Sequence, residues 1–181
     1  VVKKLKYEKN KGKIVEFDET LITEESNIIQ LSPGALGGKG RGLAFIHTLI
    51  YNFDISHYVP GINIKAPRTF IIGTNEFEDF LDNNRLRNRI YSETSYDKIK
   101  ELFIGGKLSA PLINKLRIIL GQIRKPLAVR SSGLFEDSLM QPFAGIFETY
   151  LLPNSNSDIE IRLTQLTEAI KLVYASIYSD T

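Results

Sequence analysis

The residues best suited to chemistry lie where a short apolar run ends. Residues 127–129 are typical of a buried strand. The run is followed at once by a cation, two hydroxyls and a glycine, namely Arg130, Ser131, Ser132 and Gly133. A guanidinium keeps its charge at neutral pH and pairs well with phosphate oxygens, and strand ends in open α/β sheets are common ligand sites. The pattern therefore predicts a polyphosphate site at Arg130.

An ion pair is the alternative role for Arg130. Glu136 and Asp137 follow it closely, and either carboxylate could pair with the guanidinium and hold the loop after the strand. The local residues alone do not choose between a phosphate contact and such a structural clamp.

A glycine-rich stretch much earlier in the chain is the second candidate. Five glycines fall between Gly34 and Gly42, with Lys39 among them, and a helical pattern of apolar residues begins at Leu43. A glycine-rich loop that opens a helix presents backbone N–H groups to an anion, and Lys39 could reach a phosphate there. The stretch is neither a P-loop, whose spacing it lacks, nor a dinucleotide fingerprint, since no clear strand precedes it. A flexible turn with a solvated lysine is the alternative.

The composition favours a globular protein and argues against several kinds of partner. The 181 residues are enough for one domain or two closely associated lobes. A formal net charge of +2 is too small to predict binding to nucleic acid or a membrane, and no apolar run is long enough to span a bilayer. There is no cysteine and there are only two histidines, so we expect no disulfide and no transition-metal site. We expect a cytoplasmic protein.

Periodicity and turn residues predict the main elements. We expect residues 1–30 to form an N-terminal arm or an edge hairpin, with a short edge strand at 13–17. A strand at 66–73 precedes a helix at 74–81, and Thr74 is its predicted N-cap. Further elements are predicted at 108–123 (helix), 143–152 (strand) and 159–177 (helix).

Four motifs together resemble one known family. In chain order they are Gly37-Gly-Lys-Gly-Arg-Gly-Leu, Ala66-Pro-Arg-Thr-Phe-Ile-Ile-Gly-Thr, Ala128-Val-Arg-Ser-Ser and Phe143-Ala-Gly-Ile-Phe-Glu-Thr-Tyr-Leu. Their order and spacing resemble the N-terminal nucleotide-binding region of phosphoenolpyruvate synthase (pyruvate, water dikinase) and pyruvate phosphate dikinase. The resemblance covers most of the chain, from about residue 30 to its end.

The resemblance implies a fold and a ligand. The fold is then α+β (α/β), an ATP-grasp-type N-terminal lobe with a mixed, mostly antiparallel sheet flanked by helices. ATP is held between two lobes, and Lys39 and Arg130 contact its phosphates as candidate catalytic residues. Gly145 and Thr149 are implied to line the phosphate site, and Glu148 matches an acidic family position. The candidate cofactor-binding residues are Lys39, Arg130, Ser131, Gly145, Glu148 and Thr149.

The resemblance also implies partners outside this chain. Residues 31–181 would be the first part of a dikinase-type ATP-binding domain, with Mg²⁺ as a second cofactor whose ligands lie elsewhere. The second half of that domain, a phosphohistidine domain and an acceptor domain would belong to a longer protein. We expect the isolated part to be inactive, and its uncovered surface to favour a homodimer.

Apolar residues stand where the family usually carries polar ones. Leu134 and Phe135 stand where the family usually has small polar residues, and Ile146 and Phe147 stand where it usually has two glutamines or similar residues. The enzymatic hypothesis is a phosphotransferase that passes a phosphoryl group from ATP to a histidine on another domain. The alternative is a non-catalytic module that senses nucleotide or supports a partner domain.

Overall fold

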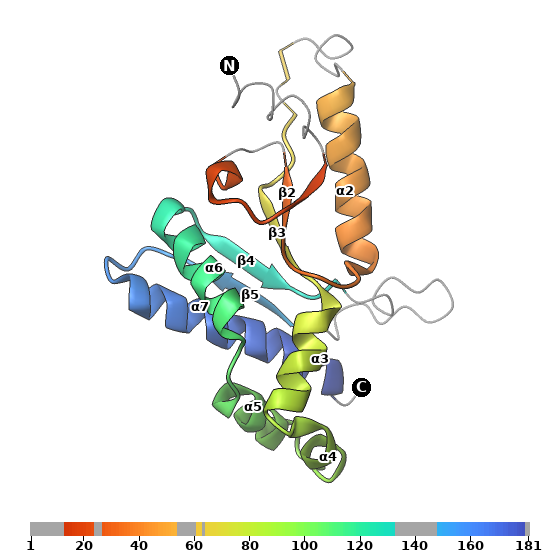
Figure 1. Ribbon diagram of the computed structural model, residues 1–181, viewed down its shortest axis with the longest axis vertical. Coiled ribbons are helices and arrows are strands. Elements are labelled where there is room, and N and C mark those ends of the chain that lie inside the picture. The colour runs from red at the N-terminus through yellow and green to blue at the C-terminus, as the bar shows by residue number, and fades with distance from the viewer. Residues whose placement is uncertain (1–12, 24–26, 54–60, 63, 133–147, 180–181) are drawn as a thin grey trace.

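Two small β-sheets and a set of helices make up the structure (Figure 1). It is a computed structural model that describes residues 13–23, 27–53, 61–62, 64–132 and 148–179. Its strands are β1 (Ile14–Glu16), β2 (Ile28–Ser32), β3 (Thr69–Ile72), β4 (Leu127–Arg130) and β5 (Thr149–Leu152). Its α-helices are α2 (Gly37–Asn52), α3 (Thr74–Asn83), α4 (Leu86–Tyr91), α5 (Tyr96–Gly105), α6 (Ala110–Gln122) and α7 (Ile159–Ala175). The predicted α+β class is confirmed.

The first sheet has the strand order β1-β2-β3, and both pairings are parallel. Its middle strand is buried on both faces, with Ile28, Ile29 and Leu31 all in the core. The chain crosses from β2 to β3 through α2, so it enters the sheet again at the same end, which gives a parallel pair. A strand therefore precedes the glycine-rich stretch, contrary to the sequence-based expectation.

Parallel pairing corrects one expectation about the strands. Two of the three pairings among the described strands are parallel, so these strands are not mostly antiparallel. The edge strand predicted at 13–17 is confirmed as β1, which runs parallel to β2. The other arm of the expected N-terminal hairpin falls on residues 1–12, outside the described residues. The chain leaves β1 through the 3₁₀ helix η1 (Glu19–Leu21), whose Leu21 is buried together with Ile22, and does not turn directly into β2.

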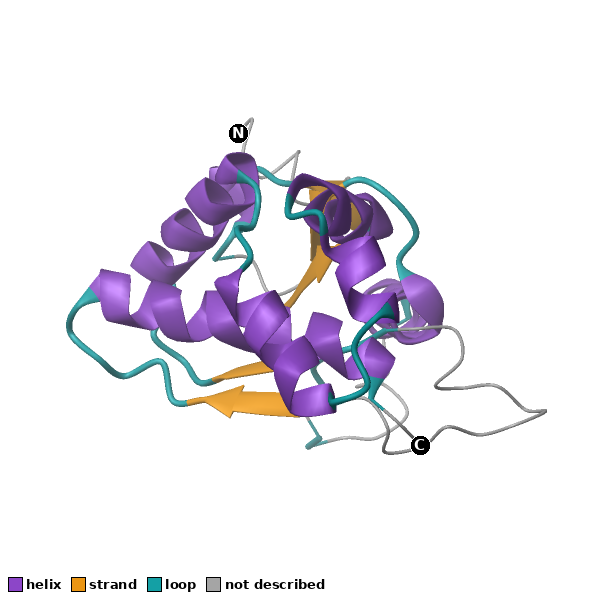
Figure 2. Ribbon diagram, turned by 90° about the horizontal axis from the view of Figure 1, so that it is seen from below, coloured by secondary structure: helices purple, strands orange, loops and turns teal. Residues whose placement is uncertain are grey.

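The second sheet is the antiparallel pair of β4 and β5, and α7 covers one of its faces (Figure 2). Side chains alternate between the two faces of a strand. The half-buried face carries the pairs Leu127–Leu152 and Val129–Tyr150. The exposed face carries the pairs Ala128–Leu151 and Arg130–Thr149. The strand predicted at 127–129 is confirmed, whereas the predicted strand at 143–152 is described only from residue 148 onward.

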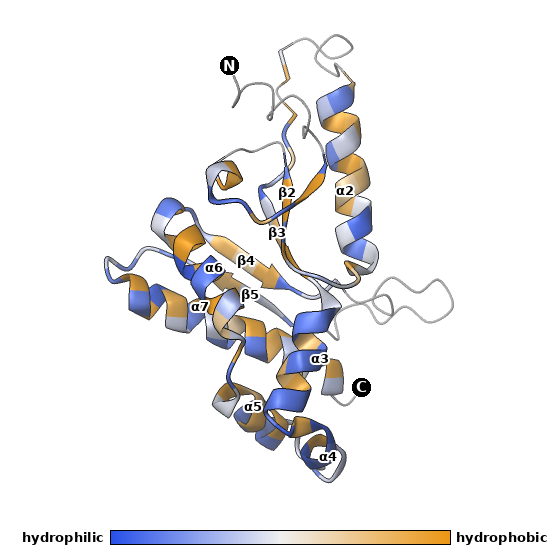
Figure 3. Ribbon diagram, in the orientation of Figure 1, coloured by the Kyte–Doolittle hydropathy of each residue, from blue (hydrophilic) through white to orange (hydrophobic). Residues whose placement is uncertain are grey.

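One hydrophobic core joins the helices α3, α5, α6 and α7. Most of the apolar residues that the helical spacing predicted on α6 and α7 are buried: Leu112, Leu116, Ile119, Leu120, Leu163, Leu166, Ile170 and Val173. Ile177, the last residue of the predicted stripe, lies beyond the end of α7 and is 46% exposed. Figure 3 shows bands of apolar and polar residues along α7. Helix α3 begins at Thr74 as predicted, but its N-cap is Gly73, because the Thr74 hydroxyl accepts instead from the N–H of Ala35 at 3.0 Å.

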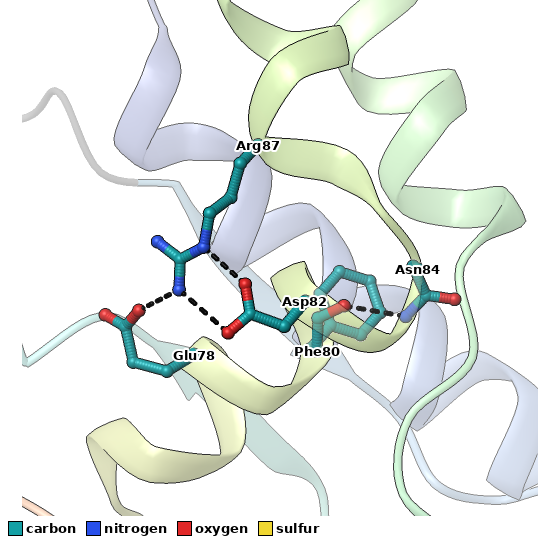
Figure 4. Close-up of polar contacts among 5 residues, drawn as sticks. All are labelled: Glu78, Phe80, Asp82, Asn84 and Arg87. Carbon is teal, nitrogen blue, oxygen red and sulfur yellow. Dashed lines mark hydrogen bonds and ion pairs between the residues drawn. The ribbon is translucent and has the colours of Figure 1, made fainter.

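A tight turn joins α3 to α4, and an exposed ion-pair network surrounds it (Figure 4). Arg85 at the turn has a left-handed backbone (φ 53°). The guanidinium of Arg87 contacts the carboxylates of both Glu78 and Asp82, and its hydrogen bond holds the pKa of Asp82 below the ordinary value. Exposed pairs of this kind contribute little to stability. Within the described parts of the chain, no helix combines the length and apolarity that crossing a bilayer demands.

Candidate functional site

Ser132 joins the two stretches that the sequence singled out. Its backbone carbonyl accepts a hydrogen bond from the N–H of Gly38 at 3.1 Å, and its Oγ accepts one from the N–H of Gly40 at 2.8 Å. The same hydroxyl donates to the carbonyl of Leu36 at 2.6 Å. The end of β4 therefore lies directly against the first turn of α2 (Figure 1). We call this contact the Ser132 junction.

Two glycines make this close approach possible. A Cβ on Gly37 would lie 1.6 Å from the carbonyl oxygen of Ser132, and Gly37 also has a positive φ of 71°. A Cβ on Gly40 would lie 3.3 Å from the Ser132 hydroxyl and 3.4 Å from a methyl group of Ile71. At Gly37 any side chain would collide with backbone, so glycine is required there. The glycine-rich composition thus serves packing between protein segments.

The N-terminal end of α3 holds the same segment from another side. The N–H of Thr74 donates to the carbonyl of Ala35 at 3.2 Å, and the N–H of Asn75 donates to the carbonyl of Pro33 at 3.3 Å. Ser32 at the end of β2 accepts from the N–H of Gly73 at 2.9 Å. The ends of β2, β3 and β4 therefore meet around the start of α2. This convergence comes from segments that are far apart in sequence.

The backbone N–H groups of the glycine-rich stretch are not arranged as the sequence suggested. The stretch is the first part of helix α2 itself, and the N–H groups of Gly38 and Gly40 already donate to Ser132. Those two groups cannot also donate to an external anion. The expectation that the stretch is a loop with exposed donors is therefore wrong for Gly38 and Gly40.

Lys39, Arg130 and Thr149 lie on the chain segments that form or adjoin the Ser132 junction. Lys39 lies between the two glycines that donate to Ser132, and Arg130 lies two positions before Ser132 on β4. Thr149 is the register partner of Arg130 on the exposed face of the second sheet. Ser131 lies within the junction and is half-buried. The fold thus brings the backbone segments that carry Lys39 and Arg130 together, and it pairs Thr149 with Arg130.

Other predicted residues fall elsewhere. Gly145 lies outside the described residues, as do both carboxylates proposed as ion-pair partners of Arg130, Glu136 and Asp137. Glu148 directly precedes Thr149, so the alternation of the strand turns its side chain to the opposite face. The structure therefore separates Glu148 from Arg130 and Thr149.

Glu148 lies in a half-buried cluster that sequence reasoning missed. The hydroxyls of Tyr96 and Tyr150 both donate to its carboxylate, and the ammonium of Lys100 lies 3.8 Å from Oε1. Tyr96 and Lys100 come from α5, so the cluster ties the start of β5 to that helix. Burial and the charge of Glu148 raise the pKa of Tyr96 to about 12, and burial also raises the pKa of Tyr150. The two-residue spacing of Glu148 and Tyr150 on a strand was the only signal in the sequence.

These tyrosines predict that the chain loses stability in strong alkali. The pKa of Tyr96 rises from 10.0 in a free side chain to about 12 in the fold, so the folded state keeps its proton after the unfolded state has lost it. The contribution is fully present below pH 10 and is lost as the pH rises through about 12. Urea denaturation between pH 9 and 12 should show this fall, with a shallower fall for Tyr96→Phe. The variant Tyr91→Phe, which changes a tyrosine that is 86% exposed, should follow the wild-type profile, and identical curves for all three proteins would contradict the prediction.

The helical glycines predict a second, local effect on stability. A Cβ on Gly42 would meet nothing within 4 Å, whereas a Cβ on Gly40 would crowd Leu36 at 3.2 Å and Ser132 at 3.3 Å. Gly42→Ala should therefore raise the free energy of unfolding by about 0.5–1 kcal/mol, because alanine favours the helix. Gly40→Ala gains the same propensity but must displace its neighbours, so it should stabilise less or destabilise. Thermal and urea unfolding of both variants measure the difference, and a larger gain from Gly40→Ala would show that the junction is loosely packed.

The described residues offer no carboxylate-rich metal site. No group of three or more histidine or acidic side chains converges anywhere in the described parts. A cavity of about 350 Å³ lies between α4 and α5, at a place that includes none of the predicted site residues. It is lined by charged side chains such as Arg89, Lys98 and Glu101. Four of its nine lining residues are charged and carry both signs, and no chemistry follows from this mixture.

Comparison with known proteins defines the class of this fold and site. The family model for the AMP/ATP-binding domain of pyruvate phosphate dikinase matches residues 34–181. The chain belongs to this family, and the resemblance carried by the four motifs is confirmed. Among curated proteins it is 25% identical, over 167 residues, to the prodigiosin synthesizing transferase PigC of Serratia marcescens. The match covers 91% of this chain but 17% of that protein, and no solved structure matches the chain.

Proposed function

We propose that this chain is the phosphate-binding part of an ATP-binding domain in a phosphotransferase related to phosphoenolpyruvate synthase. The observation that carries the proposal is the Ser132 junction, because it sets Lys39 and Arg130 on neighbouring segments. Membership of a family of AMP/ATP-binding domains supports ATP as the ligand. The ATP-grasp arrangement, with ATP held between two lobes, is part of the same proposal.

Each candidate residue has a chemical task in this proposal. Phosphoryl transfer is catalysed mainly by positioning and by neutralising charge on the transferring oxygens. The ammonium of Lys39 and the guanidinium of Arg130 supply the two positive charges, and Arg130 can bind two oxygens at once. The hydroxyls of Ser131 and Thr149, with the backbone at Gly145, complete the phosphate contacts. Glu148 acts differently: we propose that its contacts with α5 hold β5 in place.

The second cofactor, Mg²⁺, does not fit the described residues. Magnesium is usually bound through one or two carboxylates together with substrate phosphates. Glu148, the acidic site residue that the structure describes, already contacts Tyr96, Tyr150 and Lys100. The Arg130–Thr149 face bears a cation, which repels a metal ion. We propose, as the family resemblance implies, that the metal ligands lie outside this chain, in the second half of the domain, and we derive no step through the metal.

The chain spans less than a fifth of the length of its curated relative, so the complete activity is also a proposal. We propose that the phosphoryl group passes to a histidine on a further domain and then to an acceptor that this chain does not select. Those domains, and a second copy of the chain in a homodimer, are the proposed partners.

Calorimetric titration of the longer protein with ATP and Mg²⁺, combined with a phosphohistidine assay, tests the proposal. Binding with formation of phosphohistidine supports the phosphotransferase. Binding without phosphohistidine supports the second candidate, a nucleotide-sensing module, which is favoured by the apolar residues Leu134, Phe135, Ile146 and Phe147. No binding at all rejects both and leaves a structural role.

A further inference from the structure

We propose that Ser132 is a positioning residue that holds the Lys39 turn of α2 against the Arg130 end of β4. This inference rests on the proposed function, in which both cations bind one triphosphate. It assigns to Ser132 no contact with the ligand. Its side chain acts through the two segments that it joins.

The geometry of the hydroxyl carries the inference. In a regular α-helix the N–H of Gly40 would donate to the carbonyl of Leu36, four residues earlier. Here the Ser132 Oγ accepts from that N–H at 2.8 Å and donates to that carbonyl at 2.6 Å. The hydroxyl therefore bridges the two groups that define the first turn of α2. A side chain two residues beyond the end of β4 thus takes part in the hydrogen bonding of a helix that begins about a hundred residues earlier.

The start of α2 depends on this bridge because it has little stability of its own. Its N-cap residue is Leu36, which has no side-chain acceptor, so no local side chain caps the helix. Four of its first six residues are glycine, and each glycine costs about 1 kcal/mol of helix propensity relative to alanine. Lys39 lies within this turn. An acceptor from Ser132 replaces the missing cap and fixes the backbone from which the Lys39 side chain extends.

The same bridge sets the relation between the two cations. Ser132 is held at three points, by the N–H groups of Gly38 and Gly40 and by the carbonyl of Leu36. Arg130 precedes it by two residues at the end of a paired strand. Lys39 and Arg130 therefore lie on two chain segments, the first turn of α2 and the end of β4, that the hydrogen bonds of Ser132 link. Loss of the Ser132 hydroxyl would let these two segments move apart, while Lys39 and Arg130 both keep their charge.

Ser132→Ala tests the inference in the longer protein. We expect the affinity for ATP, measured by calorimetry with Mg²⁺, to fall by about tenfold, since a lost hydrogen bond is worth up to about that factor. Ser132→Thr keeps a hydroxyl at the same place and should retain an affinity close to wild type. The matched control is Ser176→Ala, which removes a buried hydroxyl that donates to the carbonyl of Val173 at the end of α7, and which should leave ATP affinity unchanged.

A double-mutant cycle separates positioning from a general loss of stability. If Ser132 acts by placing Lys39, then Ser132→Ala should have little further effect on ATP affinity once Lys39 is alanine. Effects that multiply in the double variant overturn the inference, as does an unchanged affinity in Ser132→Ala. Should Ser132→Ala fail to fold, the threonine variant decides, because tenfold weaker binding with a folded Ser132→Thr overturns it too. A wild-type protein that binds no ATP overturns both the inference and the proposed function.

Discussion

Replacing Arg130 by alanine in the longer protein should lower the rate of phosphoryl transfer by a factor of about 10²–10³. Arg130 ends β4 on the exposed face of the second sheet, with Thr149 as its register partner. A guanidinium there would pair with phosphate oxygens and offset the charge that they carry in the transition state. Removing it leaves that charge uncompensated, and water is a poorer substitute because it must reorganise. Lys39→Ala should have an effect of similar size for the same reason.

Single-turnover formation of phosphohistidine from labelled ATP measures this rate without interference from the acceptor. The expected change lies in the rate at saturating ATP as well as in the affinity, because the cations act on the transferring group. Arg89→Ala is the matched control, since it removes an exposed arginine from α4 outside the Ser132 junction, and its rate should equal that of wild type. An unimpaired Lys39→Ala, Arg130→Ala double variant would reject the proposed role of both residues.

Elements with a clear period were predictable from the sequence, and the reason is physical. Helices α6 and α7 lie half in the core, so their apolar residues repeat at the spacing of one helix face. Strand β2 is different, because it is buried on both faces and only Gln30 interrupts its apolar run. A short run of this kind has no alternation that distinguishes it from a loop or a piece of helix. Because β2 was not predicted, its parallel pairing with β1 and β3 could not be predicted either.

The candidate site was predictable in its residue types but not in its construction. Lys39 and Arg130 could be proposed as candidates because glycine-rich turns and strand ends are common phosphate sites, and because their motifs resemble a known family. The role of Ser132 required knowing that β4 meets α2, a contact between segments far apart in the chain. The position of Glu148 could not be predicted for the same reason. Only the strand register shows that its side chain lies on the face opposite Arg130, where it contacts α5.

Replacing the buried Arg162 by alanine should lower the free energy of unfolding of the 181-residue chain by about 3–5 kcal/mol. The side chain is 2% exposed, and its Nη1 donates to the carbonyl of Leu120 at 2.8 Å and to Oδ1 of Asn154 at 3.1 Å. Asn154 in turn donates to the carbonyls of Ile123 and Lys125. Arg162 thus extends from α7 to cap the C-terminal end of α6, where helix carbonyls lack partners and a positive charge is favoured. Alanine would leave both a cavity and unpaired buried acceptors.

A second arginine between the same two helices provides the control. Arg117 on α6 donates to both carboxylate oxygens of Glu160 on α7, at 2.9 and 3.0 Å, but both side chains are exposed. Water replaces such contacts readily, so Arg117→Ala should leave the stability almost unchanged. Urea denaturation followed by circular dichroism compares the two variants, and Arg162→Lys, which keeps a charged donor, should fall between them. Equal losses of stability for Arg117→Ala and Arg162→Ala would mean that charge alone holds the two helices together. We expect a larger loss for Arg162→Ala, because the buried acceptors that it leaves cannot bond to water instead.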